Sequence, residues 1–292
     1  MTSEKSHIQR LSEILIEING ETCALPGMLD YRLHQSEEFF SALCNKKDER
    51  HIYEILSAGV AVLRAKEEKT MFTQSGGLIA TGPFKGMKYL PYSLSSLLAP
   101  KLLGTYEQEL TQYLHDSAHL YESFVDIGCA EGYYLSGMSF INPSLVARGV
   151  DVDDVAVSSA NLLCSLNKLE NAKAFICLET AMEAVTGDCL FLIDVDGREI
   201  EVIQRVTDLM GQKKIHKSFT VIVETDLNPD GSSNRLEIID FLKSKGLKIV
   251  QELKYDIKGR FIKETLGRSD LERFVLAYER SITNQSWIIA ES

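Results

Sequence analysis

The first third of the chain has the apolar spacing of amphipathic helices. Hydrophobic residues recur there every three or four positions, as they do along the buried face of a helix. Three stretches show this spacing: Ile8–Ile18, Met28–Leu43 and Ile52–Leu63. Between Met71 and Tyr92 the sequence becomes rich in glycine and short β-prone pieces, which predicts a loop or a small strand pair. We therefore expect a mainly helical N-terminal segment over residues 1–93.

Beyond residue 94 short apolar runs alternate with amphipathic stretches. The apolar runs predict strands at Phe124–Ile127, Leu145–Val150, Lys173–Cys177, Cys189–Ile193, Thr220–Val223, Leu247–Leu253 and Ser286–Ala290. The stretches between them predict helices at Tyr134–Phe140, Asp154–Leu169, Arg198–Gly211 and Arg235–Lys245. A further helix is expected from a Thr105 cap to about His115. This alternation is typical of an α/β domain whose mostly parallel, seven-stranded sheet has helices on both faces, here over residues 94–292.

Composition and charge narrow the classes of protein. The chain has 292 residues, of which 45% are hydrophobic and six are prolines, so it can bury a substantial core. Its formal net charge is -11, and its nearest approach to a basic run, Lys213–Lys217, is short. Because binding to a phosphate backbone draws on Lys and Arg, we expect no nucleic acid as a partner. A basic patch assembled only by folding stays open.

The cysteines and the N-terminus bear on the cellular environment. The six cysteines are scattered without a Cys-x-x-Cys pair, which favours small buried apolar side chains over zinc ligands or disulfides. The N-terminus lacks the apolar core of a signal peptide, and no run approaches the length of a membrane span. We therefore expect a cytoplasmic protein that does not enter a membrane, with its oligomeric state open.

The most specific chemical signal is the segment Ser123–Gly132, SFVDIGCAEG. Its pattern Asp126-x-Gly128-x-x-x-Gly132 predicts a buried strand, a tight turn lined by Cys129 and Ala130, and the start of a helix. We interpret this turn as one wall of a pocket for a ligand that carries a nucleoside, with an ordinary strand-to-helix turn as the alternative.

The next apolar run ends at Asp151, nineteen residues past Gly132. An acid at the end of the neighbouring strand is placed to accept hydrogen bonds from both hydroxyls of a ribose. Asp153 is more typical of a helix cap. Together the two signals predict a nucleoside cofactor that the chain binds at these strand ends.

The first position of the glycine pattern indicates which cofactor this is. A dinucleotide site has glycine there, whereas this chain has Asp126, whose carboxylate would repel a pyrophosphate. A carboxylate can instead hold the ammonium group of an amino-acid tail, although a buried acid that caps the helix is the alternative for Asp126. The combination resembles motif I of class I S-adenosylmethionine (SAM) methyltransferases, with Asp151 in the place of the ribose-binding acid.

A second motif, LIDVDGREIEVI at Leu192–Ile203, resembles the I-D-V-E-G-x-E pattern of the FkbM family of SAM-dependent methyltransferases. It departs from that pattern at Asp196, where the family has glutamate, and at Leu192, where lysine is frequent. Similarity continues in Gly104–Glu107, in Val221–Glu224 and, more weakly, in Gly82–Met87. The resemblance implies a class I methyltransferase fold and methyl transfer from SAM to a hydroxyl oxygen, often on a sugar or a secondary metabolite.

The resemblance also suggests roles for residues around the predicted pocket. Tyr106 and Glu107 would close over the amino-acid end of SAM or over the substrate, with helix-surface packing as the alternative. Asp194 is the candidate base that takes the hydroxyl proton, and a helix cap is its alternative. Asp196 is a candidate substrate contact or cap.

Glu224 and Asp226 end the following strand and could meet Asp194 across the crevice. Glu224 is then a further candidate substrate contact. Three carboxylates at that point would suit Mg²⁺ or Ca²⁺, while acids exposed on a solvated loop are the plainer interpretation. The sequence therefore leaves a divalent metal possible, and we assign none.

The resulting hypothesis is SAM-dependent O-methylation of a small molecule or a glycan. Three alternatives stay open. A protein or RNA methyltransferase would have the same cofactor site, a SAM-binding protein without catalysis would bind the cofactor without turnover, and a nicotinamide oxidoreductase is disfavoured by Asp126.

Overall fold

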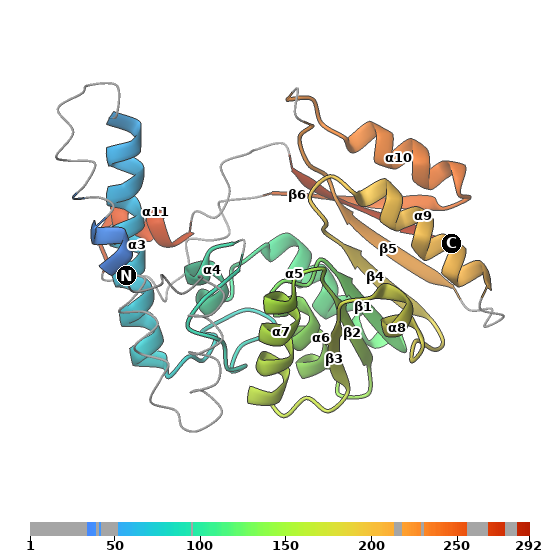
Figure 1. Cartoon of the computed structure of the whole chain (residues 1–292), viewed down its shortest axis with the longest axis horizontal. Helices are drawn as coiled ribbons and strands as arrows, with labels where there is room; N and C mark the ends of the chain where they lie inside the picture. The colour runs from blue at the N-terminus through green and yellow to red at the C-terminus, as the bar shows by residue number, and fades with distance from the viewer. Residues whose placement is uncertain are drawn as a thin grey trace, which may run out of the picture. The chain divides into compact units, whose positions relative to one another are not determined.

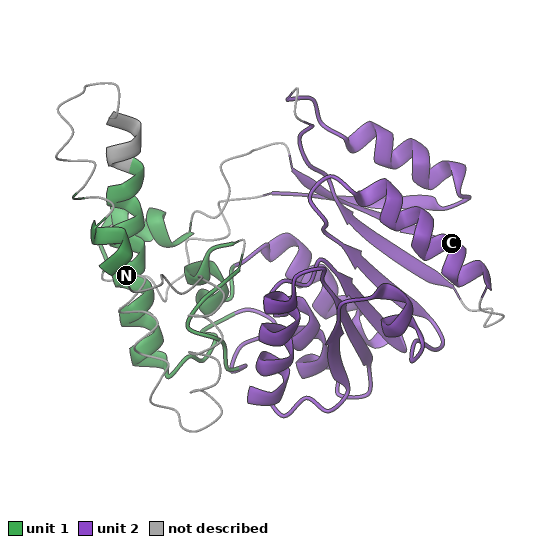
Figure 2. Cartoon of the chain, in the orientation of Figure 1, with its two compact units in different colours: residues 1–81, 88–105, 257–279 green, residues 82–87, 106–256, 280–292 purple. Residues whose placement is uncertain are grey.

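The computed structural model describes residues 34–38, 41, 52–94, 96–212, 218–228, 231–255, 268–277 and 285–292. The chain divides into two compact units (Figure 2). The helical unit comprises residues 1–81, 88–105 and 257–279, and the sheet unit comprises residues 82–87, 106–256 and 280–292. This division differs from the predicted boundary at residue 94, because residues 94–105 and 257–279 group with the N-terminal part of the chain.

The sheet unit is built on one sheet of seven strands, as the apolar runs predict (Figure 1). Its order is β3-β2-β1-β4-β5-β7-β6, and β7 runs antiparallel to both β5 and β6 while the other pairings are parallel. The strands are β1 (Ser123–Ile127), β2 (Val146–Val150), β3 (Ala172–Phe175), β4 (Cys189–Ile193), β5 (Phe219–Glu224), β6 (Lys248–Lys254) and β7 (Ser286–Glu291). The predicted class I methyltransferase fold is confirmed.

Helices cover both faces of this sheet (Figure 1). Successive side chains of a strand point to opposite faces, and Val125 and Phe191 lie in one core with residues of α9 and α10. The alternate positions Phe124 and Leu190 are fully buried as well, so the second face is also covered. The helices of the sheet unit are α5 (Gln108–Ser117), α6 (Tyr133–Ile141), α7 (Asp154–Leu166), α8 (Leu178–Met182), α9 (Glu199–Gln212) and α10 (Arg235–Ser244).

Two predictions about helices in and next to the sheet unit need correction. Helix α5 begins at Gln108, and its N-terminal flanking residue is Glu107 with φ 42°, whereas the predicted cap, Thr105, lies buried earlier in the chain. Helix α8 was not predicted, because a helix of five residues is too short to show an apolar period. Asp153 caps α7 as predicted, since its Oδ1 accepts the amide of Val155 at 2.8 Å.

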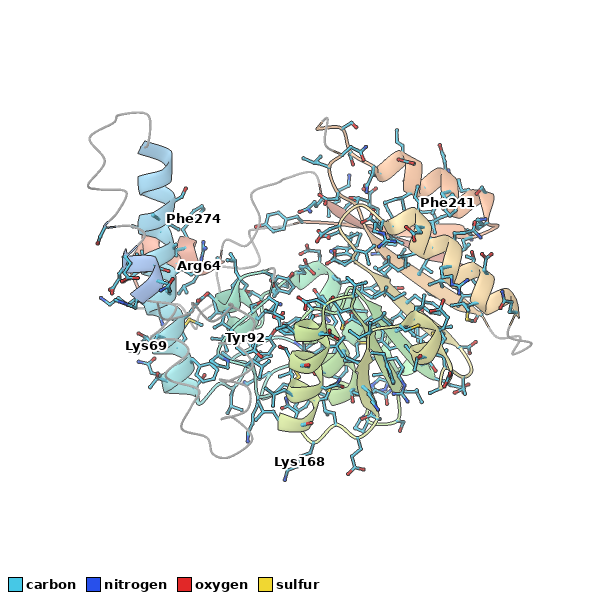
Figure 3. The ribbon with its side chains drawn as sticks, in the orientation of Figure 1. Arg64, Lys69, Tyr92, Lys168, Phe241 and Phe274 are labelled. Atoms are coloured by element: carbon cyan, nitrogen blue, oxygen red, sulfur yellow. The ribbon has the colours of Figure 1, made fainter. Side chains whose placement is uncertain are left out.

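The helical unit contains α3 (Ile52–Ser75), α4 (Leu98–Leu103) and the unpredicted α11 (Asp270–Ala277). The guanidinium of Arg64 on α3 donates to the carbonyl of Val275 on α11 at 3.4 Å. Figure 3 labels Arg64 on α3 and Phe274 on α11. Glu68 accepts the amide of Ala99 at 3.1 Å and so caps the start of α4. None of the helices described in either unit is long and apolar enough to cross a membrane.

The predicted N-terminal helices are confirmed in part. The helix expected at Ile52–Leu63 continues to Ser75, so the glycine-rich loop begins later than Met71 and contains one isolated antiparallel bridge, Leu78 to Lys88. Of the helix expected at Met28–Leu43, residues 34–38 and 41 are described, and they are helical. The helix expected at Ile8–Ile18 lies outside the described residues.

Phe84 anchors residues 82–87 to α6. Its ring lies 5.2 Å from the ring of Tyr133, and a Cβ atom on Gly137 would come within 2.4 Å of it. We expect Phe84→Ala to lower the free energy of unfolding by about 3–5 kcal/mol, because it removes a fully buried ring and leaves a cavity. Urea denaturation followed by tryptophan fluorescence measures this. Phe274→Ala, at a position 46% exposed, is the control, and an equal loss in both variants would contradict the packing role.

Candidate functional site

The loop that follows β1 is shaped by the packing of the chain around it. Gly128 has φ 88°, and a Cβ atom there would lie 1.6 Å from the carbonyl oxygen of Asp194. Gly132 has φ 85°, and its Cβ atom would lie 2.9 Å from that of Ala160 on α7. Neighbouring segments therefore leave no space for a side chain at either position, so the fold itself requires both glycines, whether or not a ligand also approaches them.

Asp126 is buried in β1 with its side chain at the start of α6. Its Oδ2 accepts the amide of Leu135 at 3.0 Å, which satisfies one of the free donors at the helix N-terminus. The capping role that the sequence left open for Asp126 is thus present, and binding of an ammonium group stays a prediction. Cys129 is buried in the loop beside it, and burial raises the pKa of its thiol, which keeps the sulfur uncharged.

Asp151 connects the end of β2 to this loop. Its Oδ2 accepts the amide of Ala130 at 2.9 Å, and its Oδ1 accepts the amide of Asp153 at 3.0 Å. Each carboxylate oxygen can accept more than one hydrogen bond, so both oxygens retain capacity for a ligand. The predicted ribose acid and the predicted turn are therefore in direct contact.

Two exposed apolar side chains lie at the same strand ends, and sequence reasoning missed them. Val152 follows Asp151 and is 84% exposed, and Ile176 is 45% exposed. Val150 at the end of β2 pairs with Phe175 at the end of β3. Val152 and Ile176 therefore come just past the carboxyl ends of two adjacent strands. Single exposed apolar residues are common, but here two flank a carboxylate at the carboxyl edge of a parallel sheet, where ligands bind in folds of this kind.

Tyr106 and Glu107 lie against the first turn of α6. The Tyr106 ring is 5.5 Å from that of Tyr133, and the buried carboxylate of Glu107 accepts a hydrogen bond from the hydroxyl of Tyr134. The packing alternative is therefore observed for both residues, and contact with a cofactor stays a prediction. The partner hydroxyl on Tyr134 was not foreseen.

Asp194 and Glu224 meet at the ends of the adjacent strands β4 and β5. A hydrogen bond joins their carboxyl groups. Burial raises the pKa of Asp194 to about 6, and the hydrogen bond from Glu224 opposes that rise. Burial and the neighbouring charge of Asp194 raise the pKa of Glu224 well above its ordinary value. The predicted meeting of these two side chains is thus observed.

Glu199 and Asp226 at this edge accept hydrogen bonds from donors of their own. Glu199 accepts the amide of Gly197 at 2.7 Å and the side-chain amide of Asn234 at 3.2 Å. Asp226 accepts the amide of Leu227 at 2.7 Å. Asn234, which the sequence did not single out, also accepts the amide of Asp226 at 2.8 Å and so connects α9 to the segment that follows β5. Within the described ranges, no three Asp, Glu, His or Cys side chains are arranged as metal ligands.

Backbone strain is concentrated in the motifs of this site. Among the described residues, non-glycine residues with positive φ are Glu107, Ala130, Lys168 and Asp196. Three of these four lie in the segments Gly104–Glu107, Ser123–Gly132 and Leu192–Ile203, while Lys168 follows the end of α7. Asp196, with φ 48°, is exposed at the turn between β4 and α9. Such conformations cost free energy and are retained where the surroundings enforce them, frequently at ligand sites.

The chain matches no protein-family model and no curated protein sequence. Similar solved structures include the METTL16 MTase domain, which is 15% identical, with a TM-score of 0.45 over 80% of this chain and 80% of that one. A SAM-dependent methyltransferase from Aquifex aeolicus is 12% identical, with a TM-score of 0.40 over 62% of this chain and 88% of that one. A protein described as an rRNA methylase from Clostridium thermocellum is 13% identical, with a TM-score of 0.41 over 63% and 94%.

The expectation of no nucleic-acid partner was wrong as an exclusion. A protein described as an rRNA methylase is among the structures that this chain resembles. The physical reason is that a net charge of -11 is summed over the whole chain and does not say where its Lys and Arg side chains lie. Membership of the FkbM family, in contrast, stays a prediction from the sequence motifs.

Proposed function

We propose that the sheet unit binds SAM and transfers its methyl group to a hydroxyl oxygen. The observation that supports this best is the carboxyl edge of β2 and β3. There Asp151, in contact with the glycine turn, is flanked by the exposed side chains of Val152 and Ile176. A carboxylate beside apolar surface suits a nucleoside, because ribose hydroxyls donate to the carboxylate while the flat base covers the apolar groups.

The residues present fit the remaining parts of this cofactor. Asp126, whose carboxylate caps α6 beside the turn, is the candidate partner of the ammonium group. In the turn Gly128–Gly132, the residue that contacts Asp151 is Ala130, whose side chain is a single methyl group. A pyrophosphate would have to approach the buried negative charge of Asp126, which disfavours a dinucleotide.

In the proposed reaction the acceptor oxygen takes the methyl carbon as the carbon–sulfur bond breaks toward sulfur, and the hydroxyl proton leaves. Asp194 lies at the neighbouring strand end and is the candidate group that accepts this proton. Asp196 and Glu224 are the candidate contacts on the acceptor side. The FkbM resemblance favours a small molecule or a sugar as acceptor.

The cofactor is tested by titration calorimetry. We expect SAM to bind the wild-type protein, and Asp151→Ala to weaken binding at least about tenfold, because two hydrogen bonds to a charged acceptor are lost. Glu170→Ala is the control, since it removes an exposed acid at the opposite edge of the sheet. Wild-type protein that binds NAD and gives no heat with SAM would overturn the proposal.

The acceptor is tested separately with SAM that carries a tritiated methyl group. Fractions of small molecules, glycans, RNA and protein from a lysate are incubated with the wild-type enzyme and with Asp194→Asn. Label that appears in the small-molecule or glycan fraction with the wild-type enzyme alone supports the proposed acceptor. Label confined to RNA or protein would contradict it while leaving the cofactor assignment intact.

A further inference from the structure

The position of Glu224 beside Asp194 follows from the register of the sheet. Strands β4 and β5 are parallel neighbours, and Ile193 pairs with Val223. The residues that follow this pair, Asp194 and Glu224, therefore lie next to each other. A hydrogen bond joins the two carboxyl groups. Ionised carboxylates are acceptors only, so a hydrogen bond between these two neighbouring groups requires a proton on one of them.

The surroundings indicate which member carries it. Glu224 is 7% exposed, whereas Asp194 as a residue keeps partial exposure to solvent. Charge is less costly at the more exposed residue, which favours the proton on Glu224 and the negative charge on Asp194. The proton then serves as the donor of the hydrogen bond to Asp194.

Other acids face the pair from every neighbouring segment. Asp196 lies on the turn after β4, Glu199 at the start of α9, and Asp226 two residues past the end of β5. Each of these acids raises the electrostatic cost of a second negative charge on the pair. Glu199 and Asp226 are held by their own hydrogen-bond donors, described above. If Asp194 and Glu224 share a single proton, the two neighbouring carboxyl groups carry one negative charge between them instead of two.

We propose that Glu224 is a positioning residue, which donates its proton in a hydrogen bond to Asp194 and keeps Asp194 as the ionised, correctly oriented base for the acceptor hydroxyl. This inference rests on the proposed function for the identity of the reaction, but the proton sharing itself does not depend on any ligand. The raised pKa of Glu224 agrees with it, because burial and the neighbouring charge of Asp194 both favour the protonated form of this carboxyl.

The proton sharing is tested in the protein without ligand, by ¹³C NMR titration of the carboxyl carbons. In the wild-type protein we expect Asp194 to titrate near pH 6 and Glu224 well above the range of an ordinary glutamate. Asp194→Asn removes the neighbouring charge and should bring the pKa of Glu224 down. An ordinary pKa for Glu224 in the wild-type protein, or no change in Asp194→Asn, would overturn the inference.

The consequence for turnover is tested with two variants of Glu224. In Glu224→Gln the side-chain amide still donates to Asp194, so we expect the acid limb of the kcat pH profile to stay where it is in the wild-type enzyme. In Glu224→Leu the donor is lost, so the pKa of Asp194 rises and the acid limb moves to higher pH. A packing role alone would give no such shift, and equal pH profiles for the two variants would overturn the inference.

The two proposals fail separately. If SAM does not bind but Glu224 shows the raised and reciprocal titration, the proposed function is wrong and the shared proton stands. If SAM binds and methyl transfer is seen while Glu224 titrates as an ordinary glutamate, the proposed function stands and the positioning role is wrong.

Discussion

We expect Gly128→Ala to prevent the sheet unit from folding into a cooperative structure. A Cβ atom at this position would lie 1.6 Å from the carbonyl oxygen of Asp194 and 2.7 Å from its carbonyl carbon. Both are backbone atoms at the end of β4, and β4 is hydrogen-bonded to β1 along its whole length. Relief of the clash therefore requires the central strands of the sheet to separate. Circular dichroism and thermal melting of purified protein measure the loss.

The matched control is Gly246→Ala. Gly246 has φ 82°, close to the value at Gly128, but a Cβ atom there meets nothing within 4 Å. This variant thus carries only the cost of a left-handed conformation, about 1–2 kcal/mol. If Gly128→Ala melted at the same temperature as Gly246→Ala, the close approach of β1 and β4 would be wrong.

The arrangement of the sheet was largely predictable because its central strands β1, β4 and β5 are buried on both faces. A strand of this kind is a short unbroken apolar run between turn residues, and Cys189–Ile193 was predicted with the limits that β4 has. Helices α8 and α11 were missed because they have five and eight residues, too few for an apolar period to stand out.

Residues of the candidate site could be predicted where the residue type itself indicates the chemistry. Contacts between segments that lie far apart in the sequence could not be predicted. Asp151 was found because an acid ends an apolar run, but the exposed Val152 beside it follows no pattern. Gly128 was correctly singled out, yet its neighbour Asp194 comes from a strand far along the chain. The partner of Glu107, the hydroxyl of Tyr134, was missed for the same reason.

Net charge was the least reliable guide, because it was used to exclude a partner. A sum over 292 residues does not resolve the distribution of charge over a surface, and recognition depends on that distribution. The acids of this chain illustrate the point, since Asp194, Asp196, Glu224 and Asp226 gather at one edge of the sheet. Elsewhere the surface can be less negative than the total suggests.

We expect Asp194→Asn to lower kcat by about 10²–10⁴-fold while SAM still binds. The amide keeps the size of the side chain but cannot accept the proton of an acceptor hydroxyl, and general-base assistance of this kind contributes a factor of that order. In the wild-type enzyme the rate should fall as pH drops below about 6, because the raised pKa of Asp194 means that the base is protonated there. Initial rates of methyl transfer across the pH range measure both effects.

Asp188→Asn is the control, because Asp188 precedes the same strand at its opposite end and contacts Ser218. We expect that variant to keep wild-type kcat. A drop of less than threefold in Asp194→Asn, with the acid limb unchanged, would show that another group takes the proton. Loss of SAM binding in Asp194→Asn would instead show that this carboxylate belongs to the cofactor site, since a base for the acceptor contributes to turnover and not to the affinity for SAM.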